Sequence, residues 1–190
     1  MSTHYIDITL LPDPEFSHAH LLGALVSKLH RALVQLQASD IGISFPRYSL
    51  HPRSLGQVLR LHGTAEALGR LLAQPWLQGM RDHVRLAELA VAPAQSATCL
   101  VQRRQFKTNA ERLRRRRMRR KGESAEQAAA AIPASIERAP NLPFVQLHSA
   151  STGQAFCLFV EQTILTESQA TSQGGFNTYG LSHGTTVPWF

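Results

Sequence analysis

An amphipathic pattern over residues 15–37 restricts the possible folds of this chain more than any other feature. Its large apolar side chains recur at the 3.6-residue spacing of one helix face: Leu22, Leu25, Val26, Leu29, Leu33 and Leu36. Segments of strand character lie on either side, at residues 4–10 and 41–45. We therefore expect a long helix between two strands, which is the beginning of a mixed α and β fold.

The alternation of strands and helices continues after this helix. Residues 57–62 are expected to form a strand, residues 64–74 a helix with Glu66 in its first turn, and residues 84–91 a fourth strand. The predicted order β-α-β-β-α-β is that of a ferredoxin-like unit, which we place at residues 1–93. One common RNA-binding module with this fold stacks bases on aromatic side chains of its sheet, whereas the third strand here, QVLRLH, has no aromatic residue. We therefore interpret this sheet as a scaffold.

The pattern changes after residue 93. Residues 100–106 are expected to form a strand, and Asn109 is a good N-cap for a helix over residues 109–121. The sequence SAEQ at residues 124–127 is a capping box that opens a second helix, and Pro133 follows its end. Further short strands are expected at 144–148, 155–160 and 162–166. The fold class is therefore α+β, with a ferredoxin-like N-terminal domain and a smaller C-terminal α+β domain.

Positive charge is concentrated in this second domain, residues 94–190. Residues 101–121 contain nine Arg and two Lys against one acid, Glu111, so that this window carries +10. The rest of the chain has nine basic and twelve acidic residues and carries −3. A positive field concentrated in this way is typical of binding to a polyanion, through phosphate neutralisation that weakens as salt rises.

Most arginines of the helix over residues 109–121 share one face on a helical wheel, whereas Arg114 and Arg117 point away. That face consists of Arg112, Arg115, Arg116 and Arg119, with Arg120 at its edge. The planar guanidinium group suits bidentate contacts with phosphate and with guanine edges, which favours a nucleic acid. The alternatives are a solvated basic face and a localisation signal, and composition alone does not separate RNA from DNA. A short RNA hairpin opens its groove at the loop and at the base, where such a helix could enter.

Other features of the sequence exclude several classes of protein. Cys99 and Cys157 lie in no CxxC motif, which argues against a disulfide framework or a zinc ribbon. We find no charged leader and no apolar stretch near the roughly 20 residues that span a bilayer, and we expect a cytoplasmic protein without a membrane partner. His18 and His20 are a weak metal signal, and no HExxH motif or carboxylate cluster accompanies them, so we expect no metal and no cofactor.

His30 lies at the boundary of the apolar face of the helix over residues 15–37. A histidine in such a place can be an ordinary interfacial residue. Ribonucleases that work without metal need a base that removes the proton of a ribose 2′-hydroxyl, whose oxygen then attacks the adjacent phosphorus. Histidine suits this role because its unperturbed pKa lies near neutral pH, so we regard His30 as a candidate base.

Several stretches from one end of the chain to the other match a known family. They are HYIDI, PDPEF, KLHRALV, IGISFP, NAERLRRRRMRR, LPFVQL, STGQAF, TYGLS and the terminal VPWF. The chain resembles the repeat-processing endoribonucleases of type I-F CRISPR systems, the Csy-type Cas endoribonucleases. This resemblance implies a ferredoxin-like N-terminal domain and an arginine-rich helix that enters the groove of a CRISPR repeat RNA hairpin. It also implies metal-independent cleavage at the 3′ side of the stem, a 2′,3′-cyclic phosphate product, and retention on the guide RNA with the other subunits of a surveillance complex.

The resemblance also implies roles for individual residues. His30 would be the general base, Ser149 would hold the 2′-hydroxyl, and Tyr179 would orient the histidine. The RNA contacts would be a stacking aromatic, Phe156, a pair that reads purines at the stem base, Arg103 and Gln105, and the groove arginines Arg116, Arg119 and Arg120.

Each of these residues has a structural alternative. Ser149 can be an ordinary turn serine, with Ser151 close enough to confuse the assignment. Tyr179 can be a core tyrosine, Phe156 can face the core, and Arg103 with Gln105 can belong to an exposed sheet face.

The chain departs from the family's pattern in a few places: Arg104 adds a charge, Arg117 extends the basic run, and the helix after Gly122 is rich in alanine. These departures leave the three catalytic candidates unchanged and concern which bases of the RNA hairpin the protein prefers. Two further functions stay open at this point: a hairpin-binding subunit without catalysis, and a DNA-binding regulator with a basic recognition helix.

Overall fold

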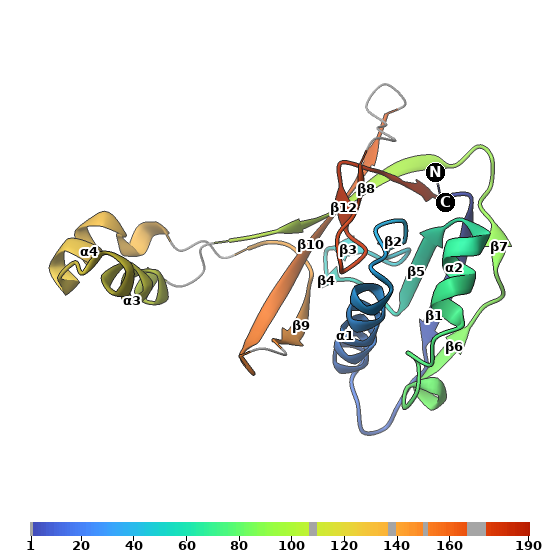
Figure 1. Ribbon diagram of the computed structural model, residues 1–190, viewed down its shortest axis with the longest axis horizontal. Coiled ribbons are helices and arrows are strands. Elements are labelled where there is room, and N and C mark those ends of the chain that lie inside the picture. The colour runs from blue at the N-terminus through green and yellow to red at the C-terminus, as the bar shows by residue number, and fades with distance from the viewer. Residues whose placement is uncertain (1, 107–109, 137–139, 150–151, 167–173) are drawn as a thin grey trace. The chain divides into compact units, whose positions relative to one another are not determined.

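The computed structural model describes residues 2–106, 110–136, 140–149, 152–166 and 174–190. The chain packs into two compact units, one of residues 1–103 with 142–190 and one of residues 104–141. It combines α-helices with antiparallel sheets (Figure 1), as the predicted α+β class requires. The division at residue 93 that the sequence suggested stays a prediction.

The larger unit contains the helices α1 (His18–Leu36) and α2 (Ala65–Leu72) and the 3₁₀ turn η1 (Arg81–His83). Its strands are β1 (His4–Leu10), β2 (Gly42–Ser44), β3 (Ser49–Leu50), β4 (Arg53–Ser54), β5 (Val58–Gly63), β6 (Val84–Leu86), β7 (Ala90–Val91), β8 (Ala97–Arg104), β9 (Phe144–His148), β10 (Ala155–Leu165), β11 (Gly175–Phe176), β12 (Ser182–His183) and β13 (Val187–Trp189). The last residue of β8 already belongs to the smaller unit, which contains α3 (Ala110–Lys121), α4 (Ala125–Ala131) and η2 (Ala134–Ile136).

The first sheet is built around β1 in the order β2-β5-β1-β6, with every described pairing antiparallel. The expected strand over residues 84–91 is divided into β6 and β7, which both pair with β1. Leu86 lies opposite Ile8, whereas Val91 lies opposite His4, so the β6–β7 side has one residue more than β1 between these pairs. An extra residue of this kind is a bulge, and it interrupts the strand that the sequence predicted as continuous.

Helix α1 confirms the helix predicted from the apolar pattern, with a later beginning. The Asp13 carboxylate accepts the backbone N–H groups of Glu15 and Phe16, which holds this segment in a turn, and the Ser17 hydroxyl caps the helix by accepting from the His20 N–H at 3.3 Å. All of the predicted apolar positions except the partly buried Leu36 are fully buried.

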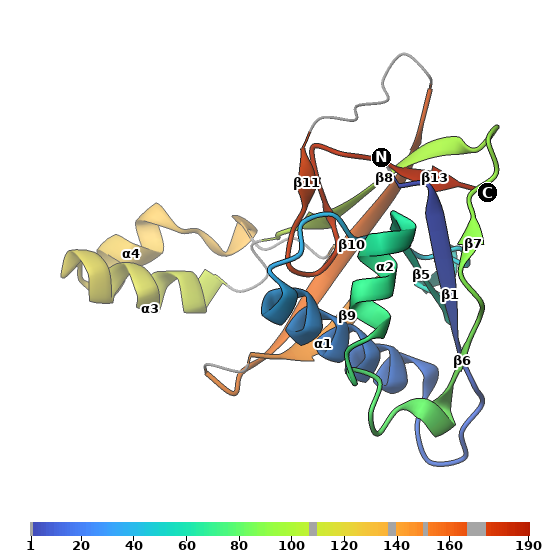
Figure 2. The same ribbon diagram turned by 45° about the vertical axis from the view of Figure 1, so that its right-hand side comes forward.

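Helix α1 also packs against a second sheet, of order β13-β8-β10-β9. It lies beside β9 in both ribbon views (Figure 2). Gly23 makes this close approach possible, because a Cβ atom there would lie 2.7 Å from the backbone oxygen of Gln146 in β9. The helix that begins the first sheet therefore also contacts the second one.

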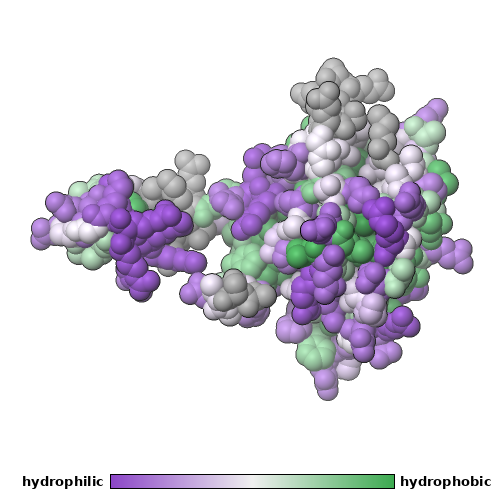
Figure 3. Space-filling model, in the orientation of Figure 1, coloured by the Kyte–Doolittle hydropathy of each residue, from purple (hydrophilic) through white to green (hydrophobic). Residues whose placement is uncertain are grey.

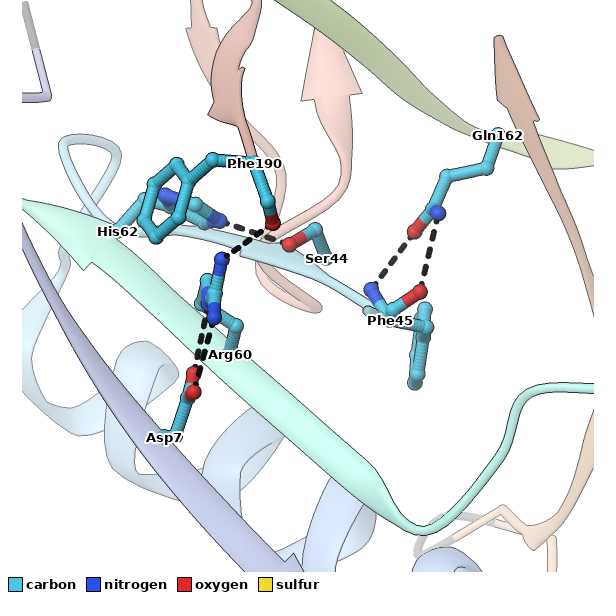
Figure 4. Close-up of polar contacts among 7 residues, drawn as sticks. All are labelled: Asp7, Ser44, Phe45, Arg60, His62, Gln162 and Phe190. Atoms are coloured by element: carbon cyan, nitrogen blue, oxygen red, sulfur yellow. Dashed lines mark hydrogen bonds and ion pairs between the residues drawn. The ribbon is translucent and has the colours of Figure 1, made fainter. Parts of the chain in front are cut away.

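The face of the first sheet opposite α1 carries a partly buried ion pair (Figure 4). The Arg60 guanidinium donates from Nε and Nη2 to the Asp7 carboxylate at 2.7 and 2.9 Å, and from Nη1 to the backbone oxygen of Phe190 at 3.1 Å. The rings of Tyr5 and Phe190 lie over the guanidinium carbon with centroids at 4.7 and 4.1 Å. These contacts fasten the chain's last residue to β1 and β5.

The side chain of Gln162 joins the two sheets at another point of the same unit. Its Oε1 accepts from the Phe45 N–H at 2.7 Å, and its Nε2 donates to the Phe45 oxygen at 3.1 Å, so that β10 is bonded to the residue after β2 (Figure 4).

His62 lies next to this ion pair and is fully buried. Its Nε2 lies 2.8 Å from the Ser44 hydroxyl, while its Nδ1 has no hydrogen-bond partner among the residues that the structure describes. Burial, assisted by the positive charge of Arg60, lowers the pKa of His62 to about 3, so that its ring is neutral at physiological pH.

Gly23→Ala is expected to destabilise the larger unit by about 1–3 kcal/mol, because the added methyl group meets a backbone oxygen that cannot rotate away. The intrinsic preference of a helix for Ala over Gly, roughly 0.8–1 kcal/mol, acts in the opposite direction and is smaller. Gly69→Ala in α2 is the matched control, since nothing lies within 4 Å of its Cβ position, and it should stabilise the protein. Urea unfolding measures both free energies; a stabilising Gly23→Ala contradicts the packing described here.

The free energy of unfolding should fall as the pH is lowered from about 6.5 towards 3, because the unfolded chain binds a proton that folded His62 does not. This one group contributes a slope of at most about 1.4 kcal/mol per pH unit. His62→Gln removes the titrating ring and keeps an amide that bonds to the Ser44 hydroxyl, so its unfolding free energy should depend less on pH. Equal slopes in the two proteins between pH 6 and pH 4 would show that His62 is not the responsible group.

Candidate functional site

His30 is half-buried on α1, at the boundary of the apolar face where the sequence placed it. Its Nδ1 lies 2.8 Å from the backbone oxygen of Thr178. A carbonyl oxygen only accepts hydrogen bonds, so Nδ1 carries the proton of the neutral ring. The other ring nitrogen, Nε2, is then the one with a free electron pair, which is the state that a general base requires.

Tyr179 lies directly against His30. The two rings are stacked, with centroids 4.0 Å apart and planes inclined by 5°. Tyr179 is also partly buried against the hydrophobic core, which agrees with the alternative of a core tyrosine. The structure thus brings together two candidate residues that are far apart in the chain.

The turn that carries Tyr179 contains two groups that the sequence analysis missed. The backbone oxygen of Thr178 holds His30, and the side chain of Asn177 accepts the backbone N–H groups of Tyr179 and Leu181. A backbone acceptor leaves no trace in the residue type. Asn177 could have been found, since Asn shortly before Gly in FNTYG is a signal of an Asx turn.

Ser149 follows β9, the strand against which α1 packs. Its backbone N–H donates to the backbone oxygen of Gln154 at 2.9 Å, and its backbone oxygen accepts from the Gly153 N–H at 2.8 Å. Its side-chain hydroxyl accepts from the Thr152 N–H at 3.3 Å. Ser149 therefore lies in the turn between β9 and β10, and Ser151, the alternative candidate, lies outside the described residues.

Phe156 and Arg103 lie on neighbouring strands of the second sheet, β10 and β8. Phe156 is half-buried on the same side of β10 as Leu158 and Val160 and packs against the core. This agrees with the alternative that Phe156 faces the core. The guanidinium carbon of Arg103 lies 6.0 Å from the centroid of the Phe156 ring, and Arg103 itself is exposed. Gln105 is exposed as well and directly follows the end of β8 at Arg104.

The arginine-rich helix α3 begins at Ala110 in the structure, and its expected N-cap, Asn109, lies outside the described residues. The exposed side chains include all five that the helical wheel grouped: Arg112, Arg115, Arg116, Arg119 and Arg120. Figure 3 shows hydrophilic side chains gathered over this helix.

Arg114 and Arg117, which the wheel placed away from that face, make contacts inside the smaller unit. Arg114 donates from Nε to the Ile132 oxygen at 2.8 Å, and Arg117 forms a two-bonded ion pair with Glu123, with Nη2 at 3.0 Å from Oε1. This pair lowers the pKa of the Glu123 carboxyl through the Arg117 hydrogen bond and charge. The predicted capping box of Ser124 and Gln127 is present and opens α4.

Within the described ranges, no group of three or more His, Cys, Asp or Glu side chains is arranged to hold a metal ion. The ring of His20 instead stacks on Phe16, at 5.3 Å between centroids. Among the helices of those same ranges, none has the length and apolar character to cross a membrane.

Comparison with known proteins identifies the family. The family model described as "CRISPR-associated protein (Cas_Csy4)" matches residues 5–190, and the chain belongs to this family. It is 50% identical over 188 residues to the CRISPR-associated endonuclease Cas6/Csy4 of Pseudomonas aeruginosa (strain UCBPP-PA14), with 98% of this chain and 99% of the relative covered. It is 39% identical over 187 residues to the protein of the same name from Escherichia coli (strain UTI89 / UPEC), with the same coverage. These matches confirm the resemblance that the sequence stretches indicated.

Among solved structures, a Cas6-related protein from Pyrococcus furiosus aligns over 99% of this chain and 98% of its own, at 12% sequence identity. The TM-score is 0.34, which is too low to support a conclusion about the fold.

Proposed function

We propose that this protein is a CRISPR-associated endoribonuclease that binds the hairpin of a CRISPR repeat and cuts precursor CRISPR RNA at the 3′ side of the stem. Its family and the names of its relatives support the class of activity. The observation that carries the mechanism is the bond from His30 Nδ1 to the Thr178 oxygen, because it leaves Nε2 as the basic nitrogen.

In the proposed reaction, Nε2 of His30 takes the proton of the ribose 2′-hydroxyl, which the hydroxyl of Ser149 holds in place. The 2′-oxygen forms a bond to the adjacent phosphorus, and the bond from phosphorus to the 5′-oxygen breaks. The products are a 2′,3′-cyclic phosphate and a 5′-hydroxyl, and solvent water supplies the proton of the leaving oxygen. The stacked ring of Tyr179 keeps the imidazole plane fixed during the transfer. No step requires a metal ion.

The exposed arginines of α3 bind the hairpin in its groove in this proposal, chiefly Arg116, Arg119 and Arg120. Phe156 stacks beneath the terminal base pair, and Arg103 and Gln105 contact purines at the base of the stem. The exposure of Arg103 and Gln105 supports their part, and the position of Arg103 beside the Phe156 ring suits an adjoining pair of contacts.

The finer points of the fold and of the cellular role belong to the same proposal. The strand order β2-β5-β1-β6, with α1 and α2 between its strands in the chain, supports a ferredoxin-like N-terminal domain over residues 1–93. After cleavage the protein stays bound to the guide RNA in the cytoplasm, as one subunit of a type I-F surveillance complex.

His30→Ala should reduce the single-turnover cleavage rate of repeat RNA by about 100-fold or more, because it removes the base. Cleavage by the unchanged protein should continue in EDTA. Repeat RNA with a 2′-deoxy sugar just upstream of the cut should bind and remain intact, since it lacks the nucleophile. Rates are measured by gel electrophoresis and affinity by filter binding.

Three outcomes decide against parts of this mechanism. Normal cleavage of the 2′-deoxy RNA excludes attack by the 2′-oxygen, and loss of cleavage in EDTA excludes metal independence. Tight binding without any cleavage supports the second candidate, a hairpin-binding subunit without catalysis.

Arg116→Gln should weaken hairpin binding. The slope of log Kd against log salt concentration should also fall, by the amount that corresponds to about one phosphate contact. Arg117→Gln removes the same charge from the same helix, but this arginine is paired with Glu123. Its salt dependence should therefore stay near that of the unchanged protein. Identical slopes for the two variants would show that total charge, rather than the exposed face, determines binding. Duplex DNA as competitor tests the remaining alternative, a DNA-binding regulator.

A further inference from the structure

The turn over residues 177–181 is organised by one side chain. Oδ1 of Asn177 accepts from the backbone N–H of Tyr179 at 2.8 Å and from that of Leu181 at 3.1 Å. The backbone of Asn177 adds two bonds, since its N–H donates to the Leu181 oxygen at 2.9 Å and its oxygen accepts from the Gly180 N–H at 2.8 Å. Asn177 thus takes part in four hydrogen bonds within five residues.

The surroundings fix this turn in place. It closes the pair of β11 and β12, in which Phe176 lies opposite Ser182. The Ile43 N–H of β2 donates to the Gly180 oxygen at 2.8 Å. Gly180 has a φ of +74°, and a Cβ atom there would lie 2.8 Å from Cγ2 of Ile43, so only glycine suits this approach.

Two contacts of His30 come from this turn. Thr178 supplies the oxygen that accepts from Nδ1, and Tyr179 supplies the stacked ring. The Tyr179 N–H that Asn177 holds lies in the same peptide group as the Thr178 oxygen, and the Leu181 N–H lies in the peptide group of Gly180 and Leu181, so the same acceptor constrains one peptide plane before Tyr179 and one after Gly180. Without it, two partly buried N–H groups lose their acceptor and the turn loses its local template.

We propose that Asn177 is a positioning residue for His30: its side-chain oxygen shapes the turn that selects the imidazole tautomer and orients the ring. This inference rests on the proposed function, because His30 acts there as the base. In this role Asn177 acts through its own turn, to which its side-chain oxygen is bonded, and not through the RNA or a reacting atom. Its effect should therefore appear in the rate of the chemical step and not in the affinity for the hairpin.

The experiment compares Asn177→Ala, Asn177→Ser and Asn177→Asp with the unchanged protein at saturating repeat RNA. Asn177→Ala loses the acceptor and should lower the single-turnover rate by about 10- to 100-fold. Asn177→Asp keeps two acceptor oxygens and should recover most of the rate, while Asn177→Ser, a weaker turn former, should lie between them. The Kd for the 2′-deoxy repeat RNA should stay within about 3-fold in all variants.

Asn141→Ala is the matched control, since Asn141 is exposed and distant in the chain from this turn, and its rate should be unchanged. Circular dichroism verifies that each variant is folded. Should Asn177→Ala fail to fold, the order of Asn, Asp and Ser still decides. The proposal is overturned if Asn177→Ala or Asn177→Ser cleaves as fast as the unchanged protein, if Asp is no better than Ser, or if the affinity falls in proportion to the rate.

A second readout separates this inference from the proposed function. ¹⁵N NMR of the His30 ring should show the proton on Nδ1 in the unchanged protein and a mixture of tautomers in Asn177→Ser. A protein that does not cut RNA at all contradicts the proposed function, yet the NMR comparison still tests the role of Asn177. Equal tautomer populations in both proteins overturn the positioning role even where cleavage is normal.

Discussion

The packing of α1 against two sheets is the constraint on which the rest of the larger unit depends. Its buried leucines and valine cover the core beside β1, and its one glycine at this contact, Gly23, lets the backbone of β9 approach from another side. A helix fixed on two sides has little freedom to rotate, because its side chains interdigitate with both partners. The Cα–Cβ bond of His30 therefore has a defined direction, set by packing elsewhere on the same helix, while the contacts to its ring come from Thr178 and Tyr179.

The contacts described for His30 are a backbone oxygen and an aromatic ring, both from one turn. The oxygen of Thr178 determines which ring nitrogen carries the proton. The turn that presents this oxygen is held by two N–H groups that donate to Asn177 and by the Gly180 oxygen, which accepts from the Ile43 N–H of β2. Backbone acceptors of this kind are rigid, since moving one means moving the turn. A carbonyl acceptor of this kind selects the ring tautomer without adding a negative charge beside the imidazole.

The arginines of α3 divide into two groups with different physical roles. Arg114 and Arg117 are bonded to Ile132 and Glu123 and hold the smaller unit together. The remaining five lie on the exposed face, and one of them, Arg115, is paired there with Glu111 through a contact of 3.1 Å between exposed side chains. A helical wheel was sufficient to predict this division, because helix periodicity fixes which side chains share a face.

The sequence was less informative about elements that exist only because they pair with another strand. It predicted α1, α2, α4 and its capping box, and most strands of both sheets, since each has a local pattern. It did not show the two-residue strands β3, β4, β11 and β12 or the bulge that divides β6 from β7, because these exist only through their partners. It also divided β10 into two strands, at a point where the structure has one continuous strand over Ala155–Leu165.

The sequence by itself determined the long amphipathic helix, the concentrated charge of α3 and the family to which the chain belongs, because each of these is written in residue types and their spacing. Only the tertiary structure decided what surrounds His30. The stacked ring of Tyr179 and the oxygen of Thr178 come from a turn far along the chain, and hydrogen bonds to backbone groups carry no signature in the residues that supply them.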